Sequence, residues 1–323
     1  MRNSFCAAVI ALAVAAGTAG AQLQSISARA DNDAFNFWKP AYDRPDEEYT
    51  SGVRGSLVYF GAAPWERWLH PGVKRCENSD SPCASHEYSL GQDIYTGKLV
   101  PGDTTHIPGT RPNAGWLYLQ ESSRFVTADR LDETSITLGV TGPPALGEQM
   151  QKFFHSLAPD YNRPTNWAVQ LPFEPGIIAA FDRTYRMVST PPSEGIGGDV
   201  EPHFGASIGN ILTEARAGLR IRAGFNVQHP WQKVAISNDA VITFFGDVTG
   251  HAVLRNEFLD GTMFTPSPYV SRRPLVADYS AGFSIRVQRL TLIYSLDQIT
   301  SEYTTRPNGH AWSRLGAEWR IER

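Results

Sequence analysis

The segment AGFSIRVQRLTLIYSLDQIT, residues 281–300, decides the fold class of this chain. Apolar residues alternate there with small or polar residues on both sides of a short turn at Arg289. The alternation runs through Phe283, Ile285 and Val287 before the turn, and through Leu290, Leu292, Tyr294 and Leu296 after it. A period of two residues places successive side chains on opposite faces of a β-strand. The segment therefore predicts two antiparallel strands with one apolar face.

Similar segments recur along the whole chain, and we count about twelve of them. Each has roughly the ten-residue length that a tilted membrane strand needs. They lie near residues 23–33, 49–61, 84–96, 113–126, 133–142, 176–189, 201–212, 213–226, 239–256, 274–287, 289–303 and 309–322. No linker or shift in composition separates two halves, so we expect a single domain over residues 22–323.

The N-terminal residues 1–21 have the pattern of a secretory signal. Arg2 precedes the apolar run AAVIALAVAA, and Ala19, Gly20 and Ala21 precede the expected cleavage site. The mature protein should therefore leave the cytoplasm. Beyond the signal, no apolar run reaches the roughly 20 residues of a membrane helix, and the net charge of −4 argues against a nucleic-acid partner. An exported all-β protein remains, either a soluble sandwich or an outer-membrane barrel.

An even number of strands with the N-terminus in the periplasm fixes the side on which every loop lies. The longest external connection is then residues 143–175. We expect an all-β fold, a transmembrane antiparallel β-barrel of about 12 strands in the outer membrane, with a short helix in this long external loop. Cys76 and Cys83 fall on the periplasmic side, where they could form a disulfide or stay as thiols.

The segment GVTGPPALGEQMQKFFHSL, residues 139–157, predicts the helix. Prolines are tolerated at the first positions of a helix, and Pro143 and Pro144 mark its start. An apolar stripe should pack on the barrel wall or on lipid acyl chains, and it consists of Leu146, Met150, Phe153, Phe154 and Leu157. Glu148, Gln151 and His155 are neighbours on the other side. That side is either a solvated polar surface or a site with His155 as its catalytic group.

Polar residues also end the first predicted strand and begin the second. Asn32 and Asp33 should meet Thr50 at the outer rim, facing inward because a polar pair in hydrocarbon is costly. Their oxygens suit Ca²⁺ or Mg²⁺, although a turn-forming Asn–Asp pair is the simpler interpretation. Lys98, after the third strand, could hold a phosphate group or be a solvated lysine.

An ordered set of motifs then resembles the outer-membrane lipid A 3′-O-deacylases, the LpxR-like family. The motifs are Asn32-Asp33, Tyr49-Thr50-x-Gly52, Gln92-Asp93-Ile94-Tyr95, Arg111-Pro112-x-Ala114-Gly115-Trp116, Gly139-Val140-x-Gly142-Pro143 followed by Gly147, Gln151 and His155, and Gly209-Asn210. The resemblance implies a twelve-stranded barrel and a site between the outer rim and a helix of an external loop. It also implies removal of the 3′-linked acyloxyacyl group of lipid A with a divalent cation, Ca²⁺ being expected.

The site residues that the resemblance assigns are Asn32, Asp33, Thr50, Gln151 and His155. Two positions depart from the family pattern. The acidic residue six positions after the histidine is replaced by Tyr161, next to Asp160, and Lys98 is the lysine nearest the expected place. The chain has no HExxH or Walker-type motif that would indicate another hydrolytic site.

These residues predict a mechanism in which neutral His155 takes a proton from water, which attacks an ester carbonyl. Gln151 would orient the imidazole or the water, and a cation held by Asp33 and Asn32 would stabilise the oxyanion. We expect a monomer whose partners are lipid A or lipopolysaccharide and other outer-membrane lipids. Two alternatives stay open: a non-enzymatic porin or scaffold barrel, and an outer-membrane phospholipase.

Overall fold

The structure is a computed structural model that describes residues 22–36, 47–61, 74–76, 82–98, 107–157, 167–190, 195–231, 236 and 238–321. The predicted signal segment 1–21, Asp160 and Tyr161 lie outside these residues.

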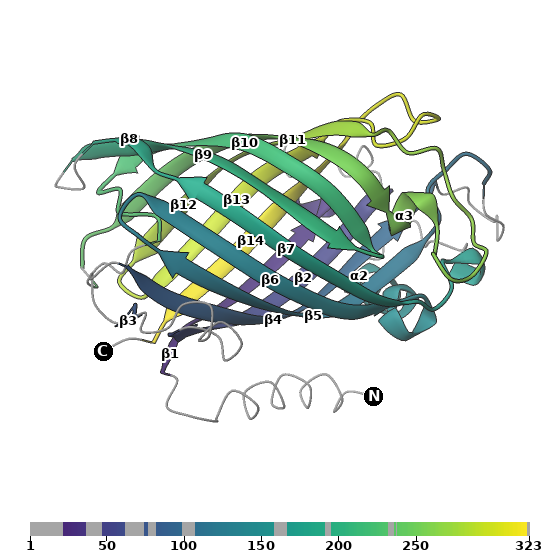
Figure 1. The fold of residues 1–323 in the computed structure, drawn as a ribbon, viewed down its shortest axis with the longest axis horizontal. Helices are drawn as coiled ribbons and strands as arrows, with labels where there is room; N and C mark the ends of the chain where they lie inside the picture. The colour runs from purple at the N-terminus through teal and green to yellow at the C-terminus, as the bar shows by residue number, and fades with distance from the viewer. Residues whose placement is uncertain are drawn as a thin grey trace.

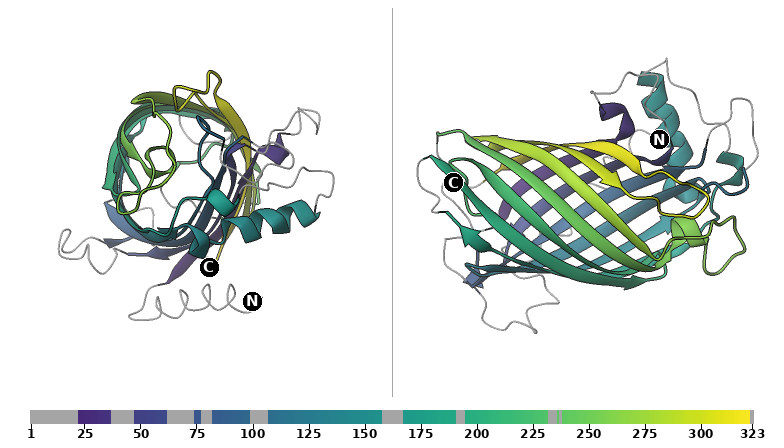
Figure 2. Two further views of the ribbon diagram at one scale, coloured as in Figure 1. Left: turned by 90° about the vertical axis from the view of Figure 1, so that its right-hand side faces the viewer. Right: turned by 90° about the horizontal axis from the view of Figure 1, so that it is seen from above.

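Twelve strands of the described chain close into one antiparallel barrel (Figures 1 and 2). They are β1 (Leu23–Asn32), β2 (Glu48–Phe60), β4 (Cys83–Thr96), β5 (Ala114–Val126), β6 (Arg130–Thr141), β7 (Pro175–Tyr185), β9 (Ile196–Gly209), β10 (Leu212–Phe225), β11 (Val241–Asn256), β12 (Leu275–Val287), β13 (Leu290–Ile299) and β14 (His310–Arg320). The first and last strands pair from Ser25 with Arg320 to Asn32 with Ser313, which closes the sheet. The predicted fold class is confirmed, and most strand ends lie within a few residues of their predicted places.

Two short strands lie outside the twelve. β3 (Lys74–Arg75) pairs in parallel with β4, and β8 (Met187–Ser189) pairs with β9. The predicted strand 176–189 is therefore divided, because β7 loses its partner β6 after the pair Arg130–Tyr185 and the chain then follows β9 alone.

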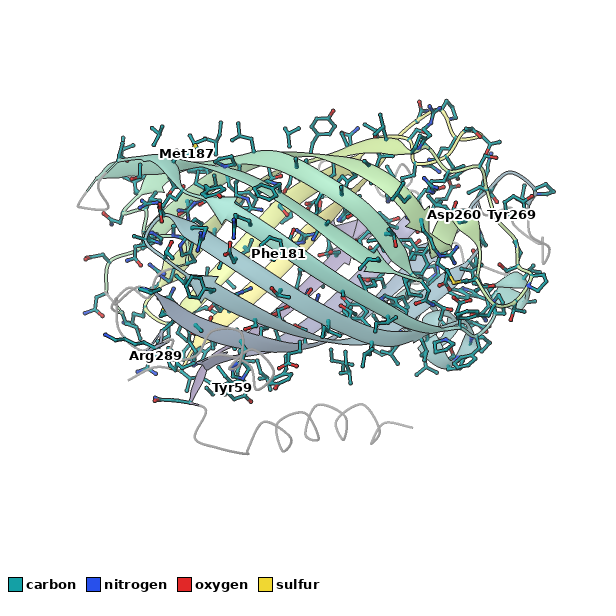
Figure 3. All side chains as sticks on the ribbon, viewed as in Figure 1. Tyr59, Phe181, Met187, Asp260, Tyr269 and Arg289 are labelled. Carbon is teal, nitrogen blue, oxygen red and sulfur yellow. A yellow bond between two sulfur atoms is a disulfide. The ribbon has the colours of Figure 1, made fainter. Side chains whose placement is uncertain are left out.

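Apolar side chains of the barrel strands point outward and polar ones point inward, which is the reverse of the arrangement in a soluble protein. In the hairpin that decides the fold, Phe283, Leu292 and Leu296 are 37%, 52% and 37% exposed, whereas Ser295 and Asp297 are buried. Phe181 and Met187 are likewise exposed on the outer wall, as the side chains in Figure 3 show. A polar interior and an apolar outer band are what a barrel in lipid requires, because hydrocarbon solvates the outer face.

Short helices gather at one end of the barrel, which we call the helix end (Figure 1). They are η1 (Asp33–Phe35), η3 (Pro143–Ala145), α2 (Gly147–Leu157), η4 (Trp167–Val169) and α3 (Glu257–Asp260). Three of them, η3, α2 and η4, lie in the connection 143–175 that was predicted to face outward from the cell. None of the helices in the described ranges is long and apolar enough to cross a membrane.

At the opposite end, Cys76 and Cys83 form a disulfide with an S–S distance of 2.09 Å. Both sulfur-bearing side chains are buried in a small cluster with Phe60 and Val126. Of the two possibilities for this pair, the structure contains the bonded one.

Candidate functional site

The helix of the predicted site begins later than the prolines indicated. Gly142 has φ = 75°, and Pro143 and Pro144 then form the 3₁₀ turn η3. Leu146 takes a left-handed conformation, after which α2 starts at Gly147. The prolines therefore fix the direction of the chain before the helix, and they are not its first turn.

Two glycines bring α2 against the outer wall of the barrel. A Cβ atom on Gly115 of β5 would lie 3.1 Å from the backbone nitrogen of Gly147, and one on Gly147 would lie 3.2 Å from the Cα of Gly115. Gly115 shares the outward face of β5 with Leu119, which is 46% exposed. The end view in Figure 2 shows the helix alongside the ring of strands. The absence of side chains at these two positions lets the two backbones touch.

The polar side of α2 faces the barrel, not the surroundings. Gln151 and His155 are only 2% and 8% exposed, whereas Phe153 is 55% exposed. The apolar stripe was predicted to pack either on the barrel wall or on lipid acyl chains. Phe153 does not pack on the barrel wall. Glu148 does not join the buried pair, because it is partly exposed and forms an ion pair with Lys152. A helix beside a lipid-facing wall can turn its apolar residues toward hydrocarbon and its polar residues toward the strands.

A tryptophan that sequence reasoning missed holds Gln151 in place. The indole Nε1 of Trp167, in η4, donates to Oε1 of Gln151 over 2.7 Å, and the Trp167 side chain is 3% exposed. A single Trp in a loop has no periodic pattern, so nothing in the sequence indicated this contact.

Thr50 lies at a bulge near the helix end of β2, between the pairings of Tyr49 and Ser51. Its Oγ1 is 2.6 Å from Oγ1 of Thr96 on β4, and both side chains are buried. Gln92, farther along β4, donates Nε2 to the carbonyl oxygen of Ala145 over 2.5 Å and so ties the wall to η3. The alternation of both strands and these contacts place the three side chains on the outer side of the wall.

Asn32 lies beside this group, because it pairs with Ser51 in register. The expectation that it faces inward is wrong. β1 alternates regularly, and Asn32 falls on the same face as Ile26, which is 44% exposed, whereas Asp31 faces the lumen and accepts from Nε of Arg314 over 3.0 Å.

Asp33 follows in η1 and is 4% exposed. Its carboxylate and the amide of Asn32 are hard oxygen donors of the kind that Ca²⁺ prefers. Within the described ranges no three His, Cys, Asp or Glu residues group as metal ligands. A cation here would therefore complete its shell with amide, hydroxyl, carbonyl or water oxygens. Lys98 is exposed two residues after Thr96, the last residue of β4.

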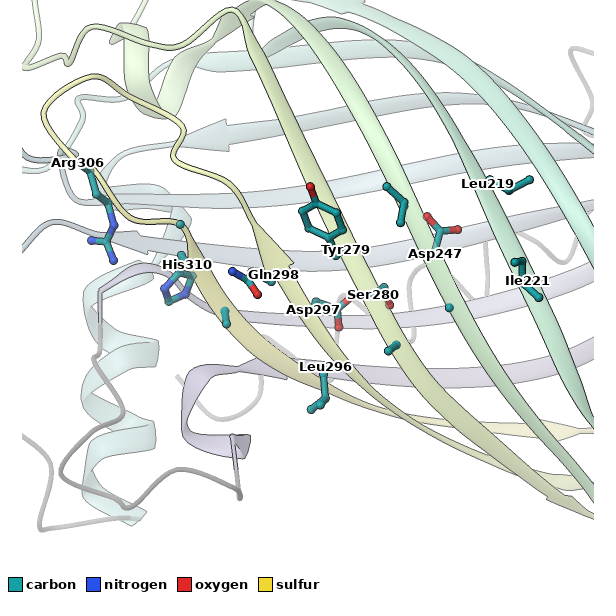
Figure 4. A pocket seen from close by; sticks show the side chains of 15 residues that line it. Leu219, Ile221, Asp247, Tyr279, Ser280, Leu296, Asp297, Gln298, Arg306 and His310 are labelled. Carbon is teal, nitrogen blue, oxygen red and sulfur yellow. The ribbon is translucent and has the colours of Figure 1, made fainter.

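Two cavities differ in their relation to these residues. The larger, of about 790 Å³, borders β10–β14 and is lined on its polar side by Asp247, Ser280, Asp297 and His310 (Figure 4). It includes none of the predicted site residues. The smaller, of about 220 Å³, is mainly apolar and is lined by Gln92 and by Met150 of α2. The predicted site residues therefore adjoin the smaller cavity and not the larger one.

Comparison with known proteins identifies the fold and the family of the chain. LpxR from Salmonella typhimurium matches over 91% of this chain and 99% of its own, with a TM-score of 0.72 and 17% identity, which shows a common fold. The β domain of the Bordetella autotransporter BrkA covers 92% of this chain and 98% of its own, with a TM-score of 0.46 and 10% identity. No curated protein sequence matches. A family model described as outer membrane protein LpxR matches residues 4–321. The resemblance seen in the motifs is confirmed, and the chain belongs to the LpxR family of outer membrane proteins.

Proposed function

We propose that this protein is an outer-membrane lipid A deacylase that hydrolyses the 3′-linked acyloxyacyl ester. The observation that carries the proposal is the burial of His155 and Gln151 between α2 and the outer wall of a membrane barrel. A site on that side is reached from the lipid. The ester of a membrane-anchored substrate can enter it while the acyl chains remain in the bilayer.

In the proposed reaction, a ring nitrogen of neutral His155 accepts a proton from water as the water oxygen attacks the ester carbonyl. The tetrahedral intermediate then releases the sugar oxygen, which receives the proton from His155. One water is consumed, and the products are the acyloxyacyl carboxylic acid and a free hydroxyl on lipid A. Gln151, held by Trp167, keeps the imidazole or the water in place.

Asn32 and Asp33 would hold a divalent cation, Ca²⁺ being expected from their oxygen donors. When bound, the cation supplies positive charge that favours a developing oxyanion. Thr50, fixed by its contact with Thr96, would position the substrate ester. Lys98 is exposed, so it is available to a phosphate of the lipid A headgroup.

The porin alternative is disfavoured because chain segments cross both ends of the lumen. At the helix end, the ring of Phe258 in α3 stacks on Tyr95 of β4 at 4.3 Å between centroids, although β11 and β4 lie on opposite sides of the barrel. At the other end, Nε1 of Trp231 donates to the carbonyl oxygen of Thr127 over 3.0 Å. An open channel needs neither crossing.

The test is mass analysis of lipid A from cells that express the wild type, His155→Ala or Ser156→Ala. Ser156 is exposed on the same helix, so its variant controls for disturbance of α2. We expect loss of the acyloxyacyl group with the wild type and the control, and intact lipid A with His155→Ala. Unchanged lipid A with the wild-type barrel inserted and Ca²⁺ present would refute the proposal. Turnover of glycerophospholipids instead would support a phospholipase, and ion conductance without hydrolysis a pore.

A further inference from the structure

An apolar groove runs along the outer barrel wall beside α2. It has a volume of about 220 Å³, and its apolar lining includes Ile26, Val53, Leu57, Leu90, Leu117 and Met150. Ile26 is 44% exposed, which places the groove on the face that the membrane contacts. The lining comes from four strands and one helix, so the groove exists only in the folded barrel.

The groove is continuous with the proposed site. Met150 precedes Gln151 on α2, and Gln92, which also lines the groove, donates to the backbone next to α2. Val53 and Leu57 lie beyond Thr50 on β2, in the direction away from the helix end. A chain in the groove would therefore lead from the site toward the middle of the membrane.

Two small residues create the depression. Ala28 on β1 and Gly55 on β2 are paired in register, so two of the smallest residues of the wall stand side by side. A Cβ atom added to Gly55 would have nothing within 4 Å. The backbone at Gly55 is therefore open to the groove, and a larger side chain there would fill the groove without meeting the protein.

We infer that this groove holds the acyl chain attached to the ester that is cleaved. The inference rests on the proposed function. It adds that the outer wall recognises the acyl chain of the substrate. An acyl chain in a bilayer is already in hydrocarbon, so the groove gains nothing from removing it from water. Its effect is positional. A seated chain holds the ester near His155, and a misplacement of about 1 Å can cost about 100-fold in rate.

The test fills the groove and compares substrates of different chain length. Gly55→Phe should lower turnover of lipid A with full-length acyl chains by about tenfold or more. A short-chain ester that does not reach the groove should be cleaved at the wild-type rate. The matched control is Gly250→Phe on the outer face of β11, where a Cβ would lie 3.9 Å from its nearest neighbour, the carbonyl oxygen of Ala217. Ala28→Leu fills the same groove from β1 and replaces Gly55→Phe if that variant fails to insert.

A second measurement does not depend on turnover. Lipid A with a photoreactive diazirine on its acyl chain should label β2 or Met150 in the His155→Ala protein. The double variant His155→Ala, Gly55→Phe should not be labelled there. Labelling elsewhere, or equal long-chain rates for Gly55→Phe and Gly250→Phe, would overturn the groove while leaving the deacylase intact. A wild type that binds at the groove but cleaves no lipid A would instead refute the proposed reaction and retain the binding site.

Discussion

The indole nitrogen of Trp167 donates to the side-chain oxygen of Gln151 over 2.7 Å, and both side chains are almost fully buried. The bond connects η4 to the face of α2 that carries His155. Because Oε1 accepts from the indole, Nε2 is the end of the amide that remains as a donor. Under the proposed function, Trp167 would therefore decide which end of the Gln151 amide faces His155, which makes Trp167 a positioning residue.

Trp167→Phe tests this role, because phenylalanine keeps an aromatic ring and removes the donor. A buried amide oxygen that loses its partner costs about 1–3 kcal/mol. We expect a fall in kcat of about tenfold, since 1.36 kcal/mol is tenfold in rate, and little change in KM. Trp231→Phe is the matched control, because it removes an indole bond of 3.0 Å at the other end of the barrel. Equal rates for the two variants would contradict the positioning role.

The strands could be predicted from sequence because each carries its own pattern. Residues 281–300 alternate so regularly that the two strands β12 and β13 and their turn were placed within a few residues. The helix was predicted for the same reason. The orientation of α2 was harder to predict. Its sequence pattern shows that the helix has a polar and an apolar face, but it does not show which face contacts lipid and which contacts the barrel. In lipid the apolar Phe153 turns outward, and the polar Gln151 and His155 turn to the wall.

The remaining contacts of the site depend on register and tertiary packing. The pairing of Thr50 with Thr96 requires a bulge after Tyr49, and no residue there marks one. The outward direction of Asn32 follows from the alternation of β1. The inward expectation rested on the cost of a polar pair in hydrocarbon, and that cost alone does not decide the face of a residue at a strand end.

The disulfide between Cys76 and Cys83 should stabilise the barrel without affecting the reaction. It closes a loop with a sequence separation of 7 at the end opposite to the helices. Chain-entropy arguments give about 2 kcal/mol for a loop of this size. The double variant Cys76→Ser, Cys83→Ser should unfold at lower urea concentration in lipid vesicles and deacylate at the wild-type rate. Reductant should lower the wild-type midpoint and leave that of the double variant unchanged. A large loss of deacylation by the folded variant would disprove this separation.

A buried carboxyl at the helix end should make stability depend on pH. Glu257 is fully buried and accepts from Oγ1 of Thr141 over 2.9 Å. Burial first, and then the charge of Glu174, raise the pKa of Glu257 from 4.5 to about 8. Glu174 remains close because it accepts from the backbone nitrogen of Met263 over 2.7 Å. Loss of the proton from Glu257 would place a second negative charge beside Glu174, so the attachment of α3 should weaken as pH rises.

The direction of the pH effect follows from the proton count. Between pH 4.5 and about 8 the folded Glu257 holds a proton that the unfolded chain releases, so rising pH favours unfolding across this window. The contribution is at most about 1.4 kcal/mol per pH unit. Glu257→Gln should remove it, so that its urea midpoint exceeds that of the wild type increasingly from about pH 5 to about pH 8. Asp129→Asn, at an exposed turn, should follow the wild type. Parallel curves for Glu257→Gln and the wild type would rule out this titration.

The contact between Gly115 and Gly147 gives the most direct test of how the helix sets the reaction. In Gly115→Ala the new methyl would lie 3.1 Å from both the nitrogen of Gly147 and the Cβ of Ala145. These atoms belong to backbone or to a short side chain, so α2 must move outward by a few tenths of an ångström. Because misplacement of about 1 Å can cost about 100-fold, we expect kcat to fall by about threefold to tenfold while the barrel still inserts.

Gly246→Ala is its control, since the Cβ would lie 4.0 Å from its nearest neighbour, the carbonyl oxygen of Ser280 on β12. Both variants add the same methyl to a barrel strand, so a difference between them reports the helix contact and not strand propensity. Rates are measured on lipid A in vesicles after insertion is checked by heat-dependent mobility on gels. If Gly115→Ala and Gly246→Ala were equally active, the reaction would tolerate movement of α2. His155 would then have to be held by contacts other than the packing of this helix on β5.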